Sequence, residues 1–434
     1  MKRSLTTAVG LAAAASLVLA GCSGDGDSGG GDGDAAADGP VELTLAGWSL
    51  STTPEFQVLA DAFHEAEPDI TVELQEYSAD DYDTQMTADL AAGSAPDMYA
   101  QKTLAGFTTY QGGGQLMDVS DVAGGFDDDT KGVEAYEVDG VTYAVPYRQD
   151  SWYLYYNQDL FDEAGVDAPD GSWTWDDYVA TAKELDGALG DGVDGTYEHT
   201  WQSTLQGFAN SQSPDGDILS GDYAYFKPYY EKAVDLQDSG AQVDYGTATT
   251  NSLSYQAQFG TQKTAMMLMG SWYVATLLAQ VESGDADEFA WGIAPAPQLD
   301  ASTTDNPVTF GDPTGVGINP AIDESKADAA KKFLSFIGGA DAAAALAEIG
   351  ITPAYQADSV VDAYFAVDGV PGDDLSKFTF ATHETAPENP VAPNVATVQA
   401  ILGDMHSAIM SGTSSIDDAI AEAQDRAKSE ADIG

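Results

Sequence analysis

Alternation between strand-like and helix-like patterns is the feature that most restricts the fold of this chain. Apolar and polar residues alternate at 41–45 and again at 70–74, as they do in half-buried strands. Between these segments, the apolar side chains fall on one face of a helix, at Phe56, Leu59, Ala60 and Phe63. A second helical pattern follows, and a short apolar run then ends near Met98. Strand, helix, strand, helix, strand predicts an α/β domain whose helices pack on a sheet.

Patterns of strands and helices continue along the rest of the chain. Residues 141–145 alternate and are followed by Pro146, which predicts a strand that ends there. Thr174 and Asp177 have the spacing of a capping box, which predicts a helix over 175–185. Residues 265–269 are a short apolar run typical of a buried strand. Further helices are predicted at 223–236, 327–337, 398–409 and 415–428.

The net charge of the chain is strongly negative. It has 15 Lys and Arg against 72 Asp and Glu, a formal charge of −57. Phosphate binding needs clustered cations, so nucleic acid is excluded as a partner. The acids are spread along the chain, which favours solvation of a surface adapted to a salty medium.

The N-terminal residues have the pattern of an export signal. A basic start at Lys2 and Arg3 precedes an apolar run over 8–20, and Cys22 is the only cysteine of the chain. Residues 19–22, LAGC, resemble a bacterial lipoprotein box. The resemblance implies removal of a signal peptide, 1–21, and lipidation of Cys22. Residues 22–40, rich in Gly, Asp and Ser, would then be a flexible linker between an extracytoplasmic lipid anchor and the globular body.

Several short motifs are informative through their order and spacing. They are FHEAEPDITV (63–72), GSAPDM (93–98), YAVP (143–146), LYYNQDLFDEAG (154–165), SWTWDD (172–177), KTAMM (263–267), GSW (270–272) and WGIAPAP (291–297). Together they resemble the extracellular solute-binding proteins of ABC importers, in the branch that binds sugars and oligosaccharides. Gln158 departs from the Lys that is usual in this family.

The resemblance implies a two-lobed α/β fold of the periplasmic-binding-protein type 2. Its lobes are discontinuous and joined by three hinge crossings, expected near 148–151, 310–314 and 352–355. Lobe 1 would comprise 41–149 and 314–352, and lobe 2 would comprise 150–313 and 353–434. The ligand would lie between the lobes, which close over it.

A sugar presents an apolar ring face and a rim of hydroxyls, so its receptor needs flat aromatic surfaces and placed polar groups. The candidates, each of which also has a packing interpretation, are Trp48, Gln101, Arg148, Asp150, Trp152, Trp201, Trp272, Asp312 and Tyr355. For Arg148 a structural pair with Asp150 is an equal alternative. Trp173, Trp175 and Trp291 are interpreted as packing residues.

Motifs of catalysis are absent from the sequence. It contains no H-E-x-x-H, no Walker A sequence and no EF-hand spacing, and its G-x-S-x-G match, GDSGG at 26–30, lies in the expected linker and so forms no nucleophile elbow. His64 and His383 are interpreted as surface positions. We therefore expect no enzyme, no cofactor and no metal, but a monomeric lipoprotein that delivers a sugar or short oligosaccharide to a membrane permease. The alternatives are the same fold with a polyamine or other small solute, a secreted glycan hydrolase, and a surface adhesin.

Overall fold

The structure, a computed structural model, describes residues 39–433 apart from 51, 53 and 191. The expected signal peptide 1–21, Cys22 and nearly all of the expected linker lie outside the described residues. The described residues from 39 to 433 belong to one compact unit. Among the described residues, none of the helices has the length and apolar content that a membrane crossing requires.

The first of two main sheets has five strands in the order β2-β1-β3-β11-β6. Their bounds are Val41–Trp48 for β1, Ile70–Tyr77 for β2, Met98–Gln101 for β3, Val145–Gln149 for β6 and Pro313–Ile318 for β11. β1 is parallel to β2 and β3, with Leu45 opposite both Leu74 and Met98, whereas β11 runs antiparallel to β3 and β6. The sheet therefore combines the N-terminal strands with one strand that returns from far along the chain.

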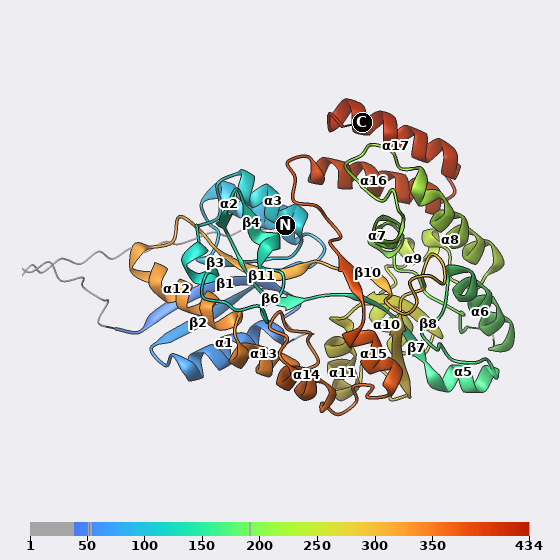
Figure 1. The fold of residues 1–434 in the computed structure, drawn as a ribbon, viewed down its shortest axis with the longest axis horizontal. Helices are drawn as coiled ribbons and strands as arrows, with labels where there is room; N and C mark the ends of the chain where they lie inside the picture. The colour runs from blue at the N-terminus through green and yellow to red at the C-terminus, as the bar shows by residue number, and fades with distance from the viewer. Residues whose placement is uncertain (1–38, 51, 53, 191, 434) are drawn as a thin grey trace, which may run out of the picture. The chain divides into compact units, whose positions relative to one another are not determined.

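Helices cover this sheet, and Figure 1 shows α1, α12 and α13 beside it. The helices of this region are α1 (Glu55–Ala66), α2 (Tyr82–Ala92), α3 (Leu104–Gly112), α4 (Ser120–Ala123), α12 (Glu324–Ile337) and α13 (Ala340–Ala347). The predicted apolar face of α1 is buried, and Phe63 packs edge-on against Phe333 of α12 with ring centroids 5.1 Å apart. A 3-10 turn, η1 (Val133–Tyr136), leads into the short hairpin of β4 (Glu137–Val138) and β5 (Val141–Thr142).

The second sheet is antiparallel, with the order β8-β7-β9. Its strands are β7 (Trp152–Asn157), β8 (Met266–Gly270) and β9 (Trp291–Pro295). Every residue of β7 and β8 is buried, and β8 confirms the buried strand predicted at 265–269. A separate parallel ribbon pairs β10 (Val308–Phe310) with β12 (Glu384–Ala386).

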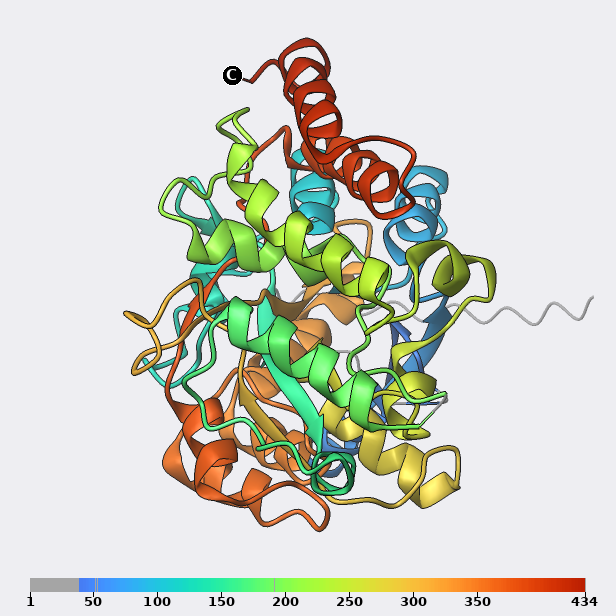
Figure 2. The ribbon, with the colours of Figure 1, turned by 90° about the vertical axis from the view of Figure 1, so that its right-hand side faces the viewer.

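The helices around the second sheet are more numerous. They are α5 (Gln158–Ala164), α6 (Trp175–Ala188), α7 (Ser203–Gln212), η2 (Ala224–Phe226), α8 (Lys227–Ser239), α9 (Tyr245–Thr250), α10 (Tyr255–Gly260), α11 (Tyr273–Ser283), α14 (Asp358–Phe365), α15 (Asp374–Ala381), α16 (Val395–Met410) and α17 (Ile416–Glu430). Thr174 and Asp177 form the predicted capping box at the start of α6. Figure 2 shows α16 and α17 packed together near the C-terminus.

Three segments pass side by side between the two sheets. Gln149, at the end of β6, is paired with Pro313 of β11. Its backbone N–H donates to the carbonyl of Thr352 at 3.2 Å, and Arg148 forms an isolated bridge with Pro353. One buried hydrophobic cluster surrounds each sheet. The predicted two-lobed α/β architecture with three crossings is confirmed, while the residue limits of the lobes stay a prediction.

Two interpretations from the sequence are wrong. The single strand expected at 141–145 is divided between β5 and β6, and β6 continues through Pro146. Proline is tolerated there because β6 is an edge strand and its pairing with β11 is irregular at Thr314 and Gly315. His383 is partly buried, with Nε2 2.9 Å from Ser151 Oγ, and so is not a surface residue.

Candidate ligand-binding site

A buried ion cluster stands at the first crossing. Arg148 Nη1 lies 2.5 Å from Glu55 Oε2, and Arg148 Nε lies 2.9 Å from Asp150 Oδ2. Arg148 Nη2 also donates to Thr314 Oγ1 at 3.1 Å. Glu55 and Asp150 are 2% and 4% exposed. The guanidinium therefore links α1, the first crossing and β11. Its contact with Asp150 is the structural pair that the sequence offered as the alternative for Arg148.

Burial governs the electrostatics of this cluster. It raises the pKa of both Glu55 and Asp150, and the nearby guanidinium opposes the rise in each case. Burial alone would lower the pKa of Arg148, but Asp150 and Glu55 reverse this and raise it. One cation is thus shared by two carboxyl groups that have little contact with water, so removal of the cation would leave both uncompensated.

The same cluster continues to the turn that carries Trp272. Ser271 Oγ donates to Asp150 Oδ1 at 3.0 Å, and the Ser271 backbone N–H donates to the Ser151 carbonyl at 2.8 Å. Gly270 precedes the turn, and a Cβ at that position would lie 2.0 Å from the Trp272 ring. The indole therefore rests directly over the Gly270 backbone, which only glycine permits.

Trp272 is partly exposed and stands edge-on to Trp152, with centroids 5.5 Å apart. Trp152 is 2% exposed and stacks on Phe310 at 4.9 Å. Trp48 is 8% exposed, and it packs edge-on against Phe56 of α1 and Tyr82 of α2. Of these three tryptophans, Trp272 is the one that is partly exposed in this structure.

A second aromatic group continues from Trp272. The Trp272 side chain forms a hydrogen bond with Tyr255. This bond lowers the pKa of Tyr255, but burial has the larger effect and raises it to about 12. Tyr255 lies 5.6 Å from Trp201 and 5.2 Å from His199, measured between ring centroids. Trp201 is partly exposed. Burial lowers the pKa of His199 to about 4, against the effect of Asp80, so this imidazole is uncharged at neutral pH.

Asp312 anchors a chain of polar side chains. Its Oδ1 accepts from the Glu388 backbone N–H at 2.8 Å, and its Oδ2 accepts from Asn389 Nδ2 at 3.2 Å. Asn389 Oδ1 in turn accepts from Gln399 Nε2 at 2.6 Å. Burial raises the pKa of Asp312, and burial together with Asp312 raises that of Glu388, against the effect of Lys102. Ionisation of one of these two carboxyl groups therefore disfavours ionisation of the other.

Gln101 and Tyr355 lie apart from these groups. Gln101 is fully buried in β3 and donates to the Tyr99 carbonyl at 3.2 Å, while its Oε1 has no partner among the described residues. Tyr355 is partly exposed and forms an isolated bridge with Thr130.

The structure therefore brings together some sequence candidates and adds others. Arg148, Asp150, Trp152 and Trp272 form one connected group, and Trp201 joins it through Tyr255. The residues that sequence reasoning missed are Glu55, Lys102, His199, Tyr255, Ser271, Glu388, Asn389 and Gln399. Apart from Ser271, which lies in the GSW motif, none of them stands in a recognisable local pattern.

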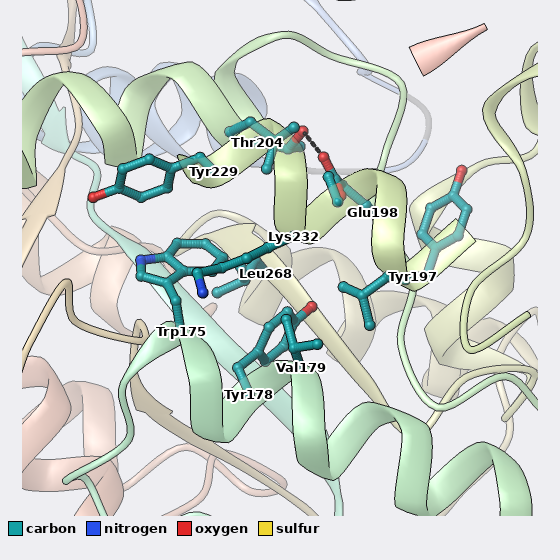
Figure 3. Close-up of a pocket in the computed structure, with 12 residues that line it drawn as sticks. Trp175, Tyr178, Val179, Tyr197, Glu198, Thr204, Tyr229, Lys232 and Leu268 are labelled. Carbon is teal, nitrogen blue, oxygen red and sulfur yellow. Dashed lines mark hydrogen bonds between the residues drawn. The ribbon is translucent and has the colours of Figure 1, made fainter. Parts of the chain in front are cut away.

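A small cavity inside the second cluster is no ligand site. Figure 3 shows Trp175, Tyr178 and Tyr229 around it, with Thr204 hydrogen-bonded to Glu198. Its volume of about 10 Å³ is no more than one water requires. Burial raises the pKa of Glu198 to about 7, and hydrogen bonds from Gln242 and Thr204 oppose this. Among the described residues no group of three acidic, histidine or cysteine side chains is placed to hold a metal ion.

Comparison with known proteins identifies the family. Residues 49–344 match the bacterial extracellular solute-binding proteins, so the chain belongs to this family. A sugar transporter from Rhizobium etli, solved in an open conformation, is 32% identical, with 89% of this chain and 99% of that chain covered and a TM-score of 0.74. The chain is accordingly a binding protein and not an enzyme.

Two further relatives show how far the likeness extends. An ABC substrate-binding protein from Listeria monocytogenes, solved with cycloalternan, shares the fold at 21% identity and a TM-score of 0.77, with 91% of this chain and 100% of that chain covered. The arabinooligosaccharide-binding protein of Halalkalibacterium halodurans is 31% identical over 156 residues, 34% of each chain. The chain thus spans about a third of the length of the curated relatives it matches.

Proposed function

We propose that this protein captures a neutral sugar or short oligosaccharide between its two lobes and delivers it to the permease of an ABC importer. The observation that carries the proposal is the likeness to the Rhizobium etli sugar transporter over 99% of that chain. The chemistry of the site supports it, because Trp272 and Trp201 are partly exposed aromatic side chains, and the amides of Gln202 and Gln399 line the same pocket as Trp201.

Trp272 would stack on one sugar ring, while the polar groups at the crossings accept its hydroxyl hydrogens. A ligand shifts the balance from open to closed lobes only through contacts that are better in the closed state. The groups that we propose for contact with a ligand from both sides are Asp80 before α2 and Lys102 between β3 and α3, together with Trp272 and Trp201 around the second sheet. The ligand-binding roles of Trp48, Gln101, Arg148, Asp150, Trp152, Trp201, Trp272, Asp312 and Tyr355 belong to this proposal.

The proposal places the protein outside the cytoplasm. Lipidation of Cys22, after removal of residues 1–21, would anchor it to the cell membrane as a monomer. Substitution Cys22→Ala tests the anchor, because the protein should move from the membrane fraction to the medium or periplasm. Continued membrane association of the Cys22→Ala variant would refute it.

A thermal-shift screen of residues 39–434 tests sugar binding. The panel comprises monosaccharides, oligosaccharides, amino acids and polyamines, each measured at high salt. A ligand that binds only the folded state raises the melting temperature. We expect a shift with one sugar class, and no shift with any sugar would contradict the proposal.

A second candidate function keeps the fold and changes the ligand to a cation such as a polyamine. The adjacent carboxyl groups of Asp312 and Glu388 favour it, because a bound cation would stabilise both in their ionised form. In the same screen, a shift with polyamines and none with sugars would establish this candidate instead.

A further inference from the structure

An open pocket of about 550 Å³ lies between the start of α7 and one face of α16. This volume is within the range of about 300–1,000 Å³ that is usual for small-molecule sites. From the segment at α7 it is lined by Thr200, Trp201 and Gln202. From α16 it is lined by Gln399, Ala400, Gly403, Asp404, His406 and Ser407. These positions of α16 repeat every three to four residues, so they share one helical face.

Two chains of contacting residues, an aromatic track and a polar track, lead from the crossing region to this pocket. The aromatic track runs from Trp272 through Tyr255 to Trp201, which forms part of the pocket wall. The polar track runs from Asp312 through Asn389 to Gln399, which forms another part of it. The pocket therefore adjoins the proposed sugar site and is not an isolated surface feature.

The polar groups of the pocket are held in fixed positions. The Gln202 amide hydrogen-bonds to Gln399, by Nε2 to the backbone carbonyl at 3.2 Å and also to the side-chain oxygen. Asp404 is fixed by Arg426 of α17, with Nη1 2.8 Å from Oδ2. Ser407 Oγ lies 3.1 Å from the hydroxyl of Tyr245. Fixed donors and acceptors of this kind suit hydroxyl groups, which bind with defined directions.

His406 is a further polar group with a fixed position at the pocket. Its side chain is 2% exposed, and its Nδ1 lies 3.2 Å from the hydroxyl of Tyr230. A hydrogen bond to the backbone of Thr200, which also lines the pocket, joins the imidazole of α16 to the segment before α7. The two walls of the pocket are therefore held together by this bond and by the bond between Gln202 and Gln399.

The charges of the pocket favour a neutral ligand. Arg426 offsets the carboxylate of Asp404, the one acidic residue of the lining. Burial lowers the pKa of His406 to about 4, so the imidazole is uncharged at neutral pH. Neither a phosphate nor a polyamine would find an uncompensated charge in this pocket.

We propose that the pocket between α7 and α16 is a second sugar subsite, and that the ligand is an oligosaccharide with one ring near Trp272 and a further ring in this pocket beyond Trp201. This inference rests on the proposed function and refines its substrate class. Gln202, Gln399 and Ser407 would then determine specificity for the distal ring.

Gly403 allows a sharp test. A Cβ at this position would meet Gln202 Oε1 at 2.5 Å, and this oxygen is the end of a flexible side chain. Gly403→Ala should therefore displace the Gln202 amide while it leaves the helix intact, and Gly403→Leu should also fill the pocket. The matched control is Gly187→Ala in α6, where a Cβ would meet nothing within 4 Å.

Calorimetry on residues 39–434 would compare mono-, di- and trisaccharides in two series, glucose to maltotriose and arabinose to arabinotriose. In the series that binds, we expect the trisaccharide to bind at least about tenfold more tightly than the monosaccharide. Gly403→Ala should weaken trisaccharide binding about tenfold and leave monosaccharide binding unchanged, while Gly187→Ala changes neither. If Gly403→Leu fails to fold, the affinities of Gly403→Ala are sufficient to test the subsite.

Two results would overturn the subsite and leave the proposed function standing. One is equal affinity for the monosaccharide and the trisaccharide. The other is an equal loss of affinity for both in Gly403→Ala. Absence of binding by sugars of every length would overturn the subsite and the proposed function together.

Discussion

Substitution of Glu198 by Gln should stabilise the protein at neutral and alkaline pH. The carboxyl group lies beside the small cavity of Figure 3, where Thr204 Oγ1 donates to it at 3.4 Å. No cation pairs with it among the described residues, so its ionisation is opposed mainly by burial. Gln has nearly the same shape and does not ionise, and its amide oxygen can accept the same hydrogen bond.

The magnitude follows from the pKa of Glu198, which rises from the ordinary value of 4.5 to about 7 in the folded protein. At about 1.36 kcal/mol per pH unit, this difference corresponds to about 3 kcal/mol. Because the folded protein holds the proton more tightly, the stabilising contribution is complete below pH 4.5 and is lost as the pH rises through about 7. The Glu198→Gln variant lacks this loss.

Urea unfolding at pH 4, 6 and 8 measures the effect as a difference between variant and wild type, so the pH dependence of all other groups cancels. The free energy of unfolding of Glu198→Gln, relative to wild type, should rise by up to about 3 kcal/mol from pH 4 to pH 8. Glu184→Gln, at an exposed position of α6, is the control and should show almost no such rise. A flat difference for Glu198→Gln would refute the reasoning, as would a difference that falls with pH.

Three further perturbations test other parts of the account. Arg148→Met should lower the free energy of unfolding in urea by about 3–5 kcal/mol because it leaves Glu55 and Asp150 buried without a cation; a loss below about 1 kcal/mol would contradict the buried cluster. Trp272→Ala should weaken sugar binding in calorimetry at least about tenfold, which is about 1.4 kcal/mol, because it removes a stacking face; unaltered affinity would remove Trp272 from the site. The melting temperature should rise steeply from low to high NaCl because salt screens the charge of −57, and a constant melting temperature would show that repulsion is unimportant.

Local patterns predicted the elements that depend on local interactions. The apolar face of α1, the capping box of α6 and the buried strand β8 all follow from residues within one helix or strand. The division of residues 141–149 into two strands, β5 and β6, could not be predicted from local patterns. Pro146 stops a strand only where its missing N–H is needed, and that depends on β11, which is more than 160 residues away.

The candidate site shows the same contrast. Trp48 directly follows Gly47, and Trp272 follows Gly270 and Ser271, each near the end of a strand, so the sequence alone predicts ligand contact for both. In the structure Trp48 is enclosed by Phe56 and Tyr82, whereas Trp272 keeps an exposed part. The difference arises from side chains that other elements supply. Glu55 was missed for a related reason, because an acidic residue in the first turn of a helix ordinarily needs no buried partner.

The most direct test of the central claim is a crystal structure of residues 39–434 with the oligosaccharide that gives the largest shift in the thermal screen. The account predicts one sugar ring against the face of Trp272, with hydrogen bonds to the ligand from residues around both sheets. A ligand bound away from Trp272 and Trp201, or held by residues around one sheet alone, would contradict capture between the lobes.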